Sequence, residues 1–308
     1  MRFPAVAGAF LFIFFSRFAM QHIGISETLN DRQFVQHFDD ELEAFGVSES
    51  SSKSIDLSGE REIDFSCGNI GTGGYLKNFQ KIVYAPLSLQ GSTITAWTQQ
   101  WNFPFPITNF FYLSNNRVRT VLIYDDSSVK FVQDLSVPSG FNFQAVHKKN
   151  LDLKQLGQYA YTLDAVNIIS LSPVNNLQNI LAAFPQKNVN VIEVDLQTHD
   201  IHYLNGHLDS FYLGDEMLYG VFFAPEQFDC LKGKALERLR NMASLLDQRA
   251  RLLKGKTDDL TCGEKLFEAS EIYKAFGKTD DKEELYAAMH AIEGIQDLLE
   301  KHNCFSAY

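Results

Sequence analysis

Several signatures of catalytic and metal-binding proteins are missing from this chain. Its four cysteines form no Cys-x-x-Cys pair, so it has neither a zinc knuckle nor a thioredoxin-like redox motif. No Gly-Lys-Ser/Thr follows a glycine-rich loop, no G-x-G-x-x-G spacing occurs, and no internal repeat is evident. These absences argue against a P-loop nucleotide site, a dinucleotide-binding fingerprint and a solenoid or propeller.

Positive charge is also scarce. The 308 residues carry 27 Lys and Arg against 38 Asp and Glu, a net charge of -11. An acidic surface repels phosphate backbones, so nucleic acid is not expected as a partner. A chain of this length can bury a core that needs no disulfides, so we expect buried free thiols, although an even number leaves disulfides open. The cysteines concerned are Cys67, Cys230, Cys262 and Cys304.

The first segment, residues 1–19, is a short hydrophobic run. Arg2 followed by Phe3–Phe15 has the charge and length of a signal-peptide core, and is too short for a comfortable membrane span of about 20 residues. No A-x-A-like cleavage triplet follows. Three alternatives stay open: a cleaved signal on a secreted or translocated protein, an uncleaved anchor, or an over-long start in which Met20 begins a cytoplasmic protein. No stable membrane span is expected.

The next two segments, residues 20–62 and 63–225, differ in composition. In the first, Ser26 precedes an amphipathic helix that ends near Gly46, and the serine-rich stretch 48–62 is predicted to be a linker or exposed loop. The second has short apolar runs rich in Val, Ile, Phe and Tyr, which are typical of strands. Two strand–helix–strand units, at 120–147 and 166–196, indicate parallel pairing. We therefore predict an α/β or α+β body with a mixed β-sheet and helical crossovers.

The last segment, residues 226–308, has helical periodicity. Apolar residues recur every three or four positions from Phe228 to Leu253, and the stripe stops at Gly255. A second helix is predicted over 258–276, and a third from the capping-box pattern Asp280-x-x-Glu283. Residues 226–256 hold eight Lys or Arg against four Asp or Glu, whereas 257–308 hold five against twelve. The segment is predicted to be a three-helix subdomain whose opposite charges favour packing.

A hairpin is predicted at Asn205-Gly206, because both residues tolerate the positive φ of a type I′ turn. The register then pairs Asp200 with Phe211. One face carries imidazoles and carboxylates, which are metal ligands or an acid/base pair. The alternative is the solvated face that any half-buried strand needs. These four residues are Asp200, His202, His207 and Asp209.

An acidic pair follows the apolar strand 120–124. Asp125 and Asp126 stand where open α/β sheets bind ligands and Mg²⁺. This stretch, continuing to His147, resembles the acidic-pair motif of haloacid-dehalogenase-like hydrolases. The resemblance implies that Asp125 and Asp126 hold Mg²⁺ beside an aspartate nucleophile for phosphoryl transfer.

The chain departs from that family in one important respect. The family opens with a strand leading into Asp-x-Asp, but the strand 82–84 here runs into Ala85-Pro86. Glu193 and Asp195 come after the acidic pair, so the nucleophile is missing unless the chain order is rearranged. The structural alternative is helix capping by Asp126 or Ser127.

Two further features have a functional and a structural interpretation. A glycine-rich turn at 67–74 holds Cys67, which together with His147 or His207 would suit a thiol hydrolase, or is simply a structural turn. The aromatic run 97–112 lines a ligand groove or forms core at a sheet edge, where Pro104 and Pro106 would block further pairing.

The acidic C-terminal stretch 278–308 resembles the glutamate-rich signals of bacterial type IV secretion substrates. That resemblance implies a bacterial effector-like or interaction protein that binds a protein partner. The alternative is a Mg²⁺-dependent phosphohydrolase of the haloacid-dehalogenase-like type, degenerate if its nucleophile is absent.

Overall fold

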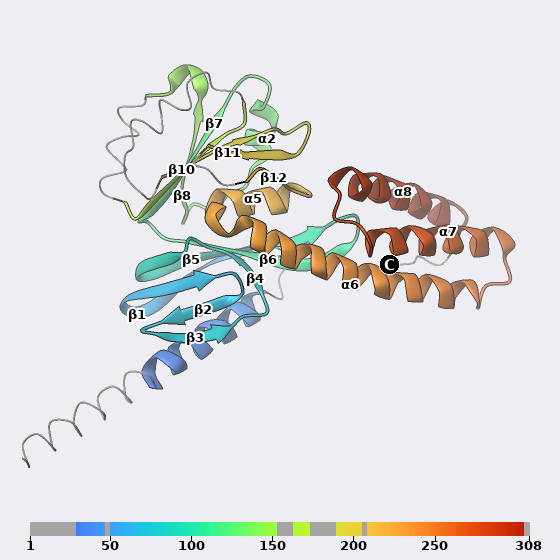
Figure 1. Cartoon of the computed structure of the whole chain (residues 1–308), viewed down its shortest axis with the longest axis horizontal. Helices are drawn as coiled ribbons and strands as arrows, with labels where there is room; N and C mark the ends of the chain where they lie inside the picture. The colour runs from blue at the N-terminus through green and yellow to red at the C-terminus, as the bar shows by residue number, and fades with distance from the viewer. Residues whose placement is uncertain (1–28, 47–49, 153–162, 173–188, 205–207, 305–308) are drawn as a thin grey trace, which may run out of the picture.

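The computed structural model describes residues 29–46, 50–152, 163–172, 189–204 and 208–304. Two six-stranded sheets and a set of helices make up an α/β or α+β architecture, as predicted. Figure 1 shows the two sheets on either side of helix α5, with the C-terminal helices projecting away from them. No helix within the described ranges is long and apolar enough to cross a bilayer.

The first sheet is mainly antiparallel and has the strand order β3-β2-β1-β5-β6-β4. Its strands are β1 (Ser50–Ser66), β2 (Asn69–Thr72), β3 (Tyr75–Asn78), β4 (Ile82–Tyr84), β5 (Ser88–Asn102) and β6 (Pro106–Ser114). A helix over residues 29–45 packs on one face through Val35, Phe38 and Leu42. Strands β4 and β6 are parallel, and the remaining pairs are antiparallel.

The predicted linker at 48–62 is wrong, because most of it belongs to β1. This strand pairs with β5 from Ser50↔Gln99 to Asp64↔Ser88. Its apolar residues alternate with polar ones: Ile55, Leu57 and Ile63 are buried, while the neighbouring Ser54, Asp56 and Ser58 are exposed. The polar side of a half-buried strand has the composition of a loop, and the pairing comes from a partner far along the chain.

The second sheet is mixed and has the strand order β12-β11-β10-β9-β7-β8. Its strands are β7 (Val118–Tyr124), β8 (Asn142–His147), β9 (Ala165–Ser170), β10 (Val189–Val194), β11 (Asp200–Tyr203) and β12 (Ser210–Phe211). The four strands β7 to β10 are parallel, which confirms the pairing predicted for both strand–helix–strand units. The first crossover helix is α2 (Val129–Asp134), and the predicted second helix lies outside the described residues.

Helix α5 (Asp215–Phe223) lies between the two sheets and holds them together (Figure 1). The last backbone carbonyls of a helix have no hydrogen-bond partner within the helix. At the C-terminal end of α5, polar side chains from the second sheet donate to such a carbonyl. Thr120 Oγ1 and Asn167 Nδ2 both donate to Phe222 O at 3.0 Å. Asn190 Nδ2 in turn donates to Asn167 Oδ1 at 2.9 Å. The buried polar residues Thr120, Asn167 and Asn190 on neighbouring strands therefore form a hydrogen-bond network that fixes the end of α5 on the second sheet.

The aromatic run forms core, and its predicted place at a sheet edge is wrong. Strands β5 and β6 are internal; Pro104 lies in the turn between them, and Pro106 is the first residue of β6, where it pairs with Asn102. Trp97 lies 4.9 Å from Tyr112 between ring centroids, and Trp101 Nε1 donates to Leu213 O at 2.8 Å. Gly220 of α5 is required here, because a Cβ would meet the Tyr84 ring at 2.4 Å.

Three helices complete the chain, as predicted: α6 (Phe228–Lys254), α7 (Leu260–Phe276) and α8 (Lys282–Lys301). Two short 3₁₀ helices also occur, η1 (Lys148–Asn150) and η2 (Pro225–Gln227). The third helix starts one residue later than expected, because Asp281 is the N-cap and accepts from Glu284 N. Phe276 packs on Phe103 and Phe105, so the core of the helices continues into the body.

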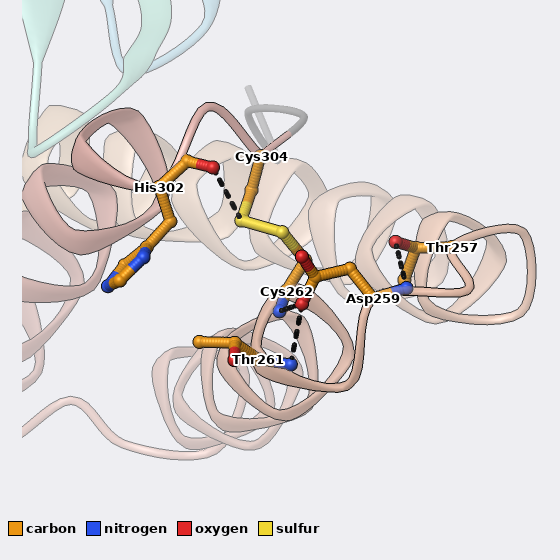
Figure 2. The surroundings of a disulfide bond; sticks show 6 residues. All are labelled: Thr257, Asp259, Thr261, Cys262, His302 and Cys304. Carbon is orange, nitrogen blue, oxygen red and sulfur yellow. Dashed lines mark hydrogen bonds between the residues drawn. A yellow bond between two sulfur atoms is a disulfide. The ribbon is translucent and has the colours of Figure 1, made fainter.

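The expectation of free thiols is wrong, because all four cysteines are paired. Cys67 in the β1–β2 turn bonds to Cys230 at the start of α6, and Cys262 near the start of α7 bonds to Cys304 after α8. Figure 2 shows the second disulfide beside Asp259, the N-cap of α7, whose carboxylate accepts from Thr261 N and Cys262 N. A protein whose core is large enough to fold without disulfides can still contain them. Chain length therefore did not predict whether the cysteines are free or paired.

Candidate functional site

The acidic pair lies at the carboxyl ends of the parallel strands. Asp125 and Asp126 follow β7, and the pairing of Tyr124 with His147 brings the end of β8 beside them. The parallel strands stand in the spatial order β8-β7-β9-β10, so the chain direction across the sheet reverses between β7 and β9. Open α/β sheets bind ligands in the crevice outside such a point. The prediction of position is therefore met in the structure.

Asp125 is fully engaged by its neighbours. Its Oδ1 accepts from Ser127 N at 2.9 Å and from Ser127 Oγ at 2.5 Å, and its Oδ2 accepts from Lys148 Nζ at 2.8 Å. The hydrogen bond from Lys148, followed by those from Ser127, holds the pKa of Asp125 well below its ordinary value. This carboxylate is ionised and neutralised within the protein.

Asp126 is exposed, and each of its carboxylate oxygens has a hydrogen-bond donor. Its Oδ2 accepts from Lys149 Nζ at 2.9 Å, and its Oδ1 lies 3.1 Å from His147 Nε2. Lys149 and then His147 lower the pKa of Asp126. Because His147 Nδ1 accepts from Lys149 N at 3.2 Å, its Nε2 carries the hydrogen that Asp126 receives. Both ring nitrogens are occupied, so His147 has no free lone pair for proton abstraction.

Lys148 and Lys149 are the residues that sequence reasoning missed. A signal existed, because a Lys-Lys pair follows β8 just as an Asp-Asp pair follows β7, and parallel strands end at one edge. A Mg²⁺ ion at Asp125 and Asp126 would have to displace both ammonium groups. In the described part of the chain no group of three or more His, Cys, Asp or Glu is arranged to hold a metal.

The strands next to β7 provide no aspartate nucleophile within the described residues. Strand β8 ends in His147 and β9 runs into Leu171 and Ser172. Ser172 is buried, and its hydroxyl has no hydrogen-bond partner in the described ranges. The strand Ile82–Tyr84 belongs to the other sheet, so it does not bring a residue to this edge.

The predicted hairpin register is confirmed at the β11–β12 pair, where Asp200 lies opposite Phe211. His202 Nδ1 lies 3.0 Å from Asp209 Oδ2, and both side chains are well exposed. His207 and the Asn205-Gly206 turn lie outside the described residues. Asp200 instead accepts from Lys282 Nζ of α8 at 2.6 Å. Of the four predicted residues, His202 and Asp209 therefore lie together, and Asp200 pairs with the helical subdomain instead.

The proposed nucleophile at Cys67 is ruled out in this structure, because its sulfur is bonded to that of Cys230. The glycines around it serve the backbone instead. Gly68 has φ +82°, and Gly73 and Gly74 have φ +56° and +88° in the β2–β3 turn. These are left-handed conformations that favour glycine. The structural interpretation of the glycine-rich turn is correct.

No protein-family model, curated protein sequence or solved structure matches this chain significantly. The described residues combine two Asp–Lys pairs at one edge of the second sheet, Asp125–Lys148 and Asp126–Lys149, with a helical extension that contains its own disulfide.

Proposed function

We propose that this chain is an interaction protein of an oxidising compartment, which contacts a protein partner through the far end of its three-helix subdomain. The observation that carries the proposal is the pairing of all four cysteines. Disulfides persist outside the reducing cytoplasm, which favours a secreted or translocated protein. A bacterial effector that works inside a reducing host cytoplasm fits this pairing less well.

Exposed apolar side chains support the choice of surface. Leu245 and Leu252 of α6 are 59% and 67% exposed, and their spacing of seven residues puts them on one face. Leu260 and Phe267 of α7 are 84% and 48% exposed. Figure 1 shows the α6–α7 end extending beyond both sheets. Large apolar groups gathered on a projecting element are typical of an interaction surface.

A photo-crosslinking residue at position 252 tests this proposal in the producing cells. We expect one discrete adduct that is lost when Leu245 is also changed to Ser. The matched control places the crosslinker at Ser244, an exposed position about a quarter of a turn around α6 from both leucines. Equal adducts from both positions, or free thiols in alkylated whole-cell extracts, would overturn the proposal.

A Mg²⁺-dependent phosphohydrolase is the second candidate. It is supported by the place of Asp125 and Asp126 at the reversal point of the parallel strands. Magnesium should then raise the melting temperature of the parent and leave Asp126→Asn unchanged. Lys149→Gln should strengthen the response, because it removes the ammonium group that occupies Asp126. No magnesium response in either the parent or Lys149→Gln would rule this function out.

A further inference from the structure

A cleft of about 230 Å³ lies between the N-terminal helix, β6 and α6. Its walls carry two cations from distant parts of the chain, Lys81 before β4 and Arg238 on α6. Thr108 and Asn109 of β6 provide polar groups, and Glu43 stands at the rim on the N-terminal helix. Figure 1 shows α6 crossing beside β4 and β6 at this place. The cleft is far from the acidic pair on the other sheet.

Arg238 is the more unusual of the two cations. Its guanidinium donates to Thr108 Oγ1 at 2.5 Å and to Gln80 O, and the exposed Glu237 is the carboxylate that acts on its charge. A guanidinium has five N–H donors, so these two acceptors do not exhaust it. Burial lowers the pKa of Arg238, because a half-buried cation lacks the solvation of an exposed one. An anion in the cleft would add to the counter-charge that the exposed Glu237 provides.

Lys81 is already partnered, in a way that leaves room for competition. Its ammonium group pairs closely with the half-buried Asp39, and Glu43 is a more distant partner at 3.4 Å. Glu43 is 76% exposed, so its side chain is free to turn away. Glu43 therefore acts as a weakly held internal anion at the cleft entrance.

We propose that this cleft binds the phosphate group of a small molecule. The planar fork of Arg238 suits bidentate pairing with two oxygens, while Lys81 supplies a second positive charge and Thr108 a hydroxyl whose present hydrogen bond to Asn109 O is long, at 3.4 Å. A phosphate has the charge and the acceptor oxygens to use all three groups, which a single carboxylate does not. Binding displaces Glu43 from the entrance.

Calorimetric titrations at constant ionic strength test the site with inorganic phosphate, glycerol phosphate and acetate. We expect phosphate to bind, and acetate to bind at least about tenfold more weakly, because it has only two acceptor oxygens. Glycerol phosphate distinguishes the sources: tighter binding than inorganic phosphate indicates an organic ester, and equal binding indicates the free ion. Equal affinity for acetate and phosphate would overturn the phosphate assignment.

Three variants locate the site. Arg238→Gln should weaken phosphate binding at least about tenfold, since it removes the charged fork. Arg249→Gln is the control, because Arg249 is exposed on the same helix and does not line the cleft. Glu43→Gln should strengthen binding about two- to fivefold, because it removes the competing anion and leaves the bonds of Arg238 intact. Unchanged affinity in both Arg238→Gln and Glu43→Gln would overturn the proposal, even if Arg238→Gln alone folds poorly.

Discussion

The sheet body and the three-helix subdomain are stabilised by different means. The body closes on large aromatic side chains from both sheets and α5, with Trp97, Trp101 and Phe223 all buried. The far ends of α6, α7 and α8 have smaller apolar residues and expose several leucines. A small helical unit buries less of its surface than a large domain, so it gains more from a covalent link. The Cys262–Cys304 disulfide lies in the three-helix subdomain, which has the smaller core of its own.

Each disulfide accordingly connects different parts of the molecule. Cys67–Cys230 spans 163 residues and ties the first sheet to the root of α6. Cys262–Cys304 spans 42 residues and stays within the subdomain, where it fastens the end of α8 to the start of α7 (Figure 2). Cys67–Cys230 should therefore stabilise the attachment of α6 to the first sheet. Cys262–Cys304 should stabilise only the three-helix subdomain.

Removal of the long-range disulfide should have the largest effect. Cys67→Ala with Cys230→Ala is expected to lower the free energy of unfolding by about 5 kcal/mol, from the loop-closure entropy of 163 residues. Urea unfolding followed by tryptophan fluorescence measures it, since both tryptophans lie in the body. A change below about 1 kcal/mol would show that aromatic packing alone joins α6 to the sheet.

Removal of the local disulfide should have a smaller and more confined effect. The Cys262–Cys304 bond closes a loop of only 42 residues, so its removal by Cys262→Ala with Cys304→Ala should lower the free energy of unfolding by about 4 kcal/mol. Hydrogen exchange should accelerate in α7 and α8 and remain slow in β5 and β6. Equal acceleration in the body would contradict the division into two regions and show one cooperative unit.

The two regions also differ in how far the sequence predicts them. The helices follow from a local period of three to four residues, so α6 ends at Lys254 before Gly255 as expected. Strand β1 was missed because its apolar residues are sparse and its partner β5 is distant in the chain. The disulfide pairing cannot be read from four cysteine positions, which allow three connectivities. Lys148 and Lys149 needed the strand register before they could be placed beside Asp125 and Asp126.

The joint between the regions should respond to pH through His199. Its ring stacks on Tyr286 of α8 at 4.5 Å and contacts Tyr212 at 5.2 Å. Burial, and then Lys282, lower the pKa of His199, against the opposing charges of Asp215, Asp200 and Asp195. The unfolded chain then binds the proton more readily, so stability falls as pH drops below about 6.5 toward the folded pKa.

His199→Phe keeps an aromatic ring at the joint and removes the titration. Unfolding free energies of parent and variant should therefore diverge between pH 7 and pH 5, with the parent losing more stability. The comparison with the variant is needed because two other groups titrate nearby. Burial raises the pKa of Asp215 and Glu216, so these carboxyl groups make the folded protein less stable as pH rises, which opposes the effect of His199. Parallel curves for the two proteins would show that His199 does not sense pH at this joint.

The smallest effect is expected from charge between the basic α6 and the acidic helices after it. Arg240 on α6 pairs with Asp280, just before α8, and both side chains are partly exposed. Arg240→Gln should cost about 0.2 to 1 kcal/mol, because water screens such pairs, and high salt should abolish the difference. Arg249→Gln is the matched control, since no described carboxylate lies within 4.0 Å of that residue. Equal protease resistance of the two variants at low salt would mean that the opposite charges of the helices do not hold the subdomain together. Its packing would then rest on the apolar stripe, the Cys262–Cys304 bond and buried or partly buried hydrogen bonds such as that from Ser270 Oγ to Asp247 Oδ1.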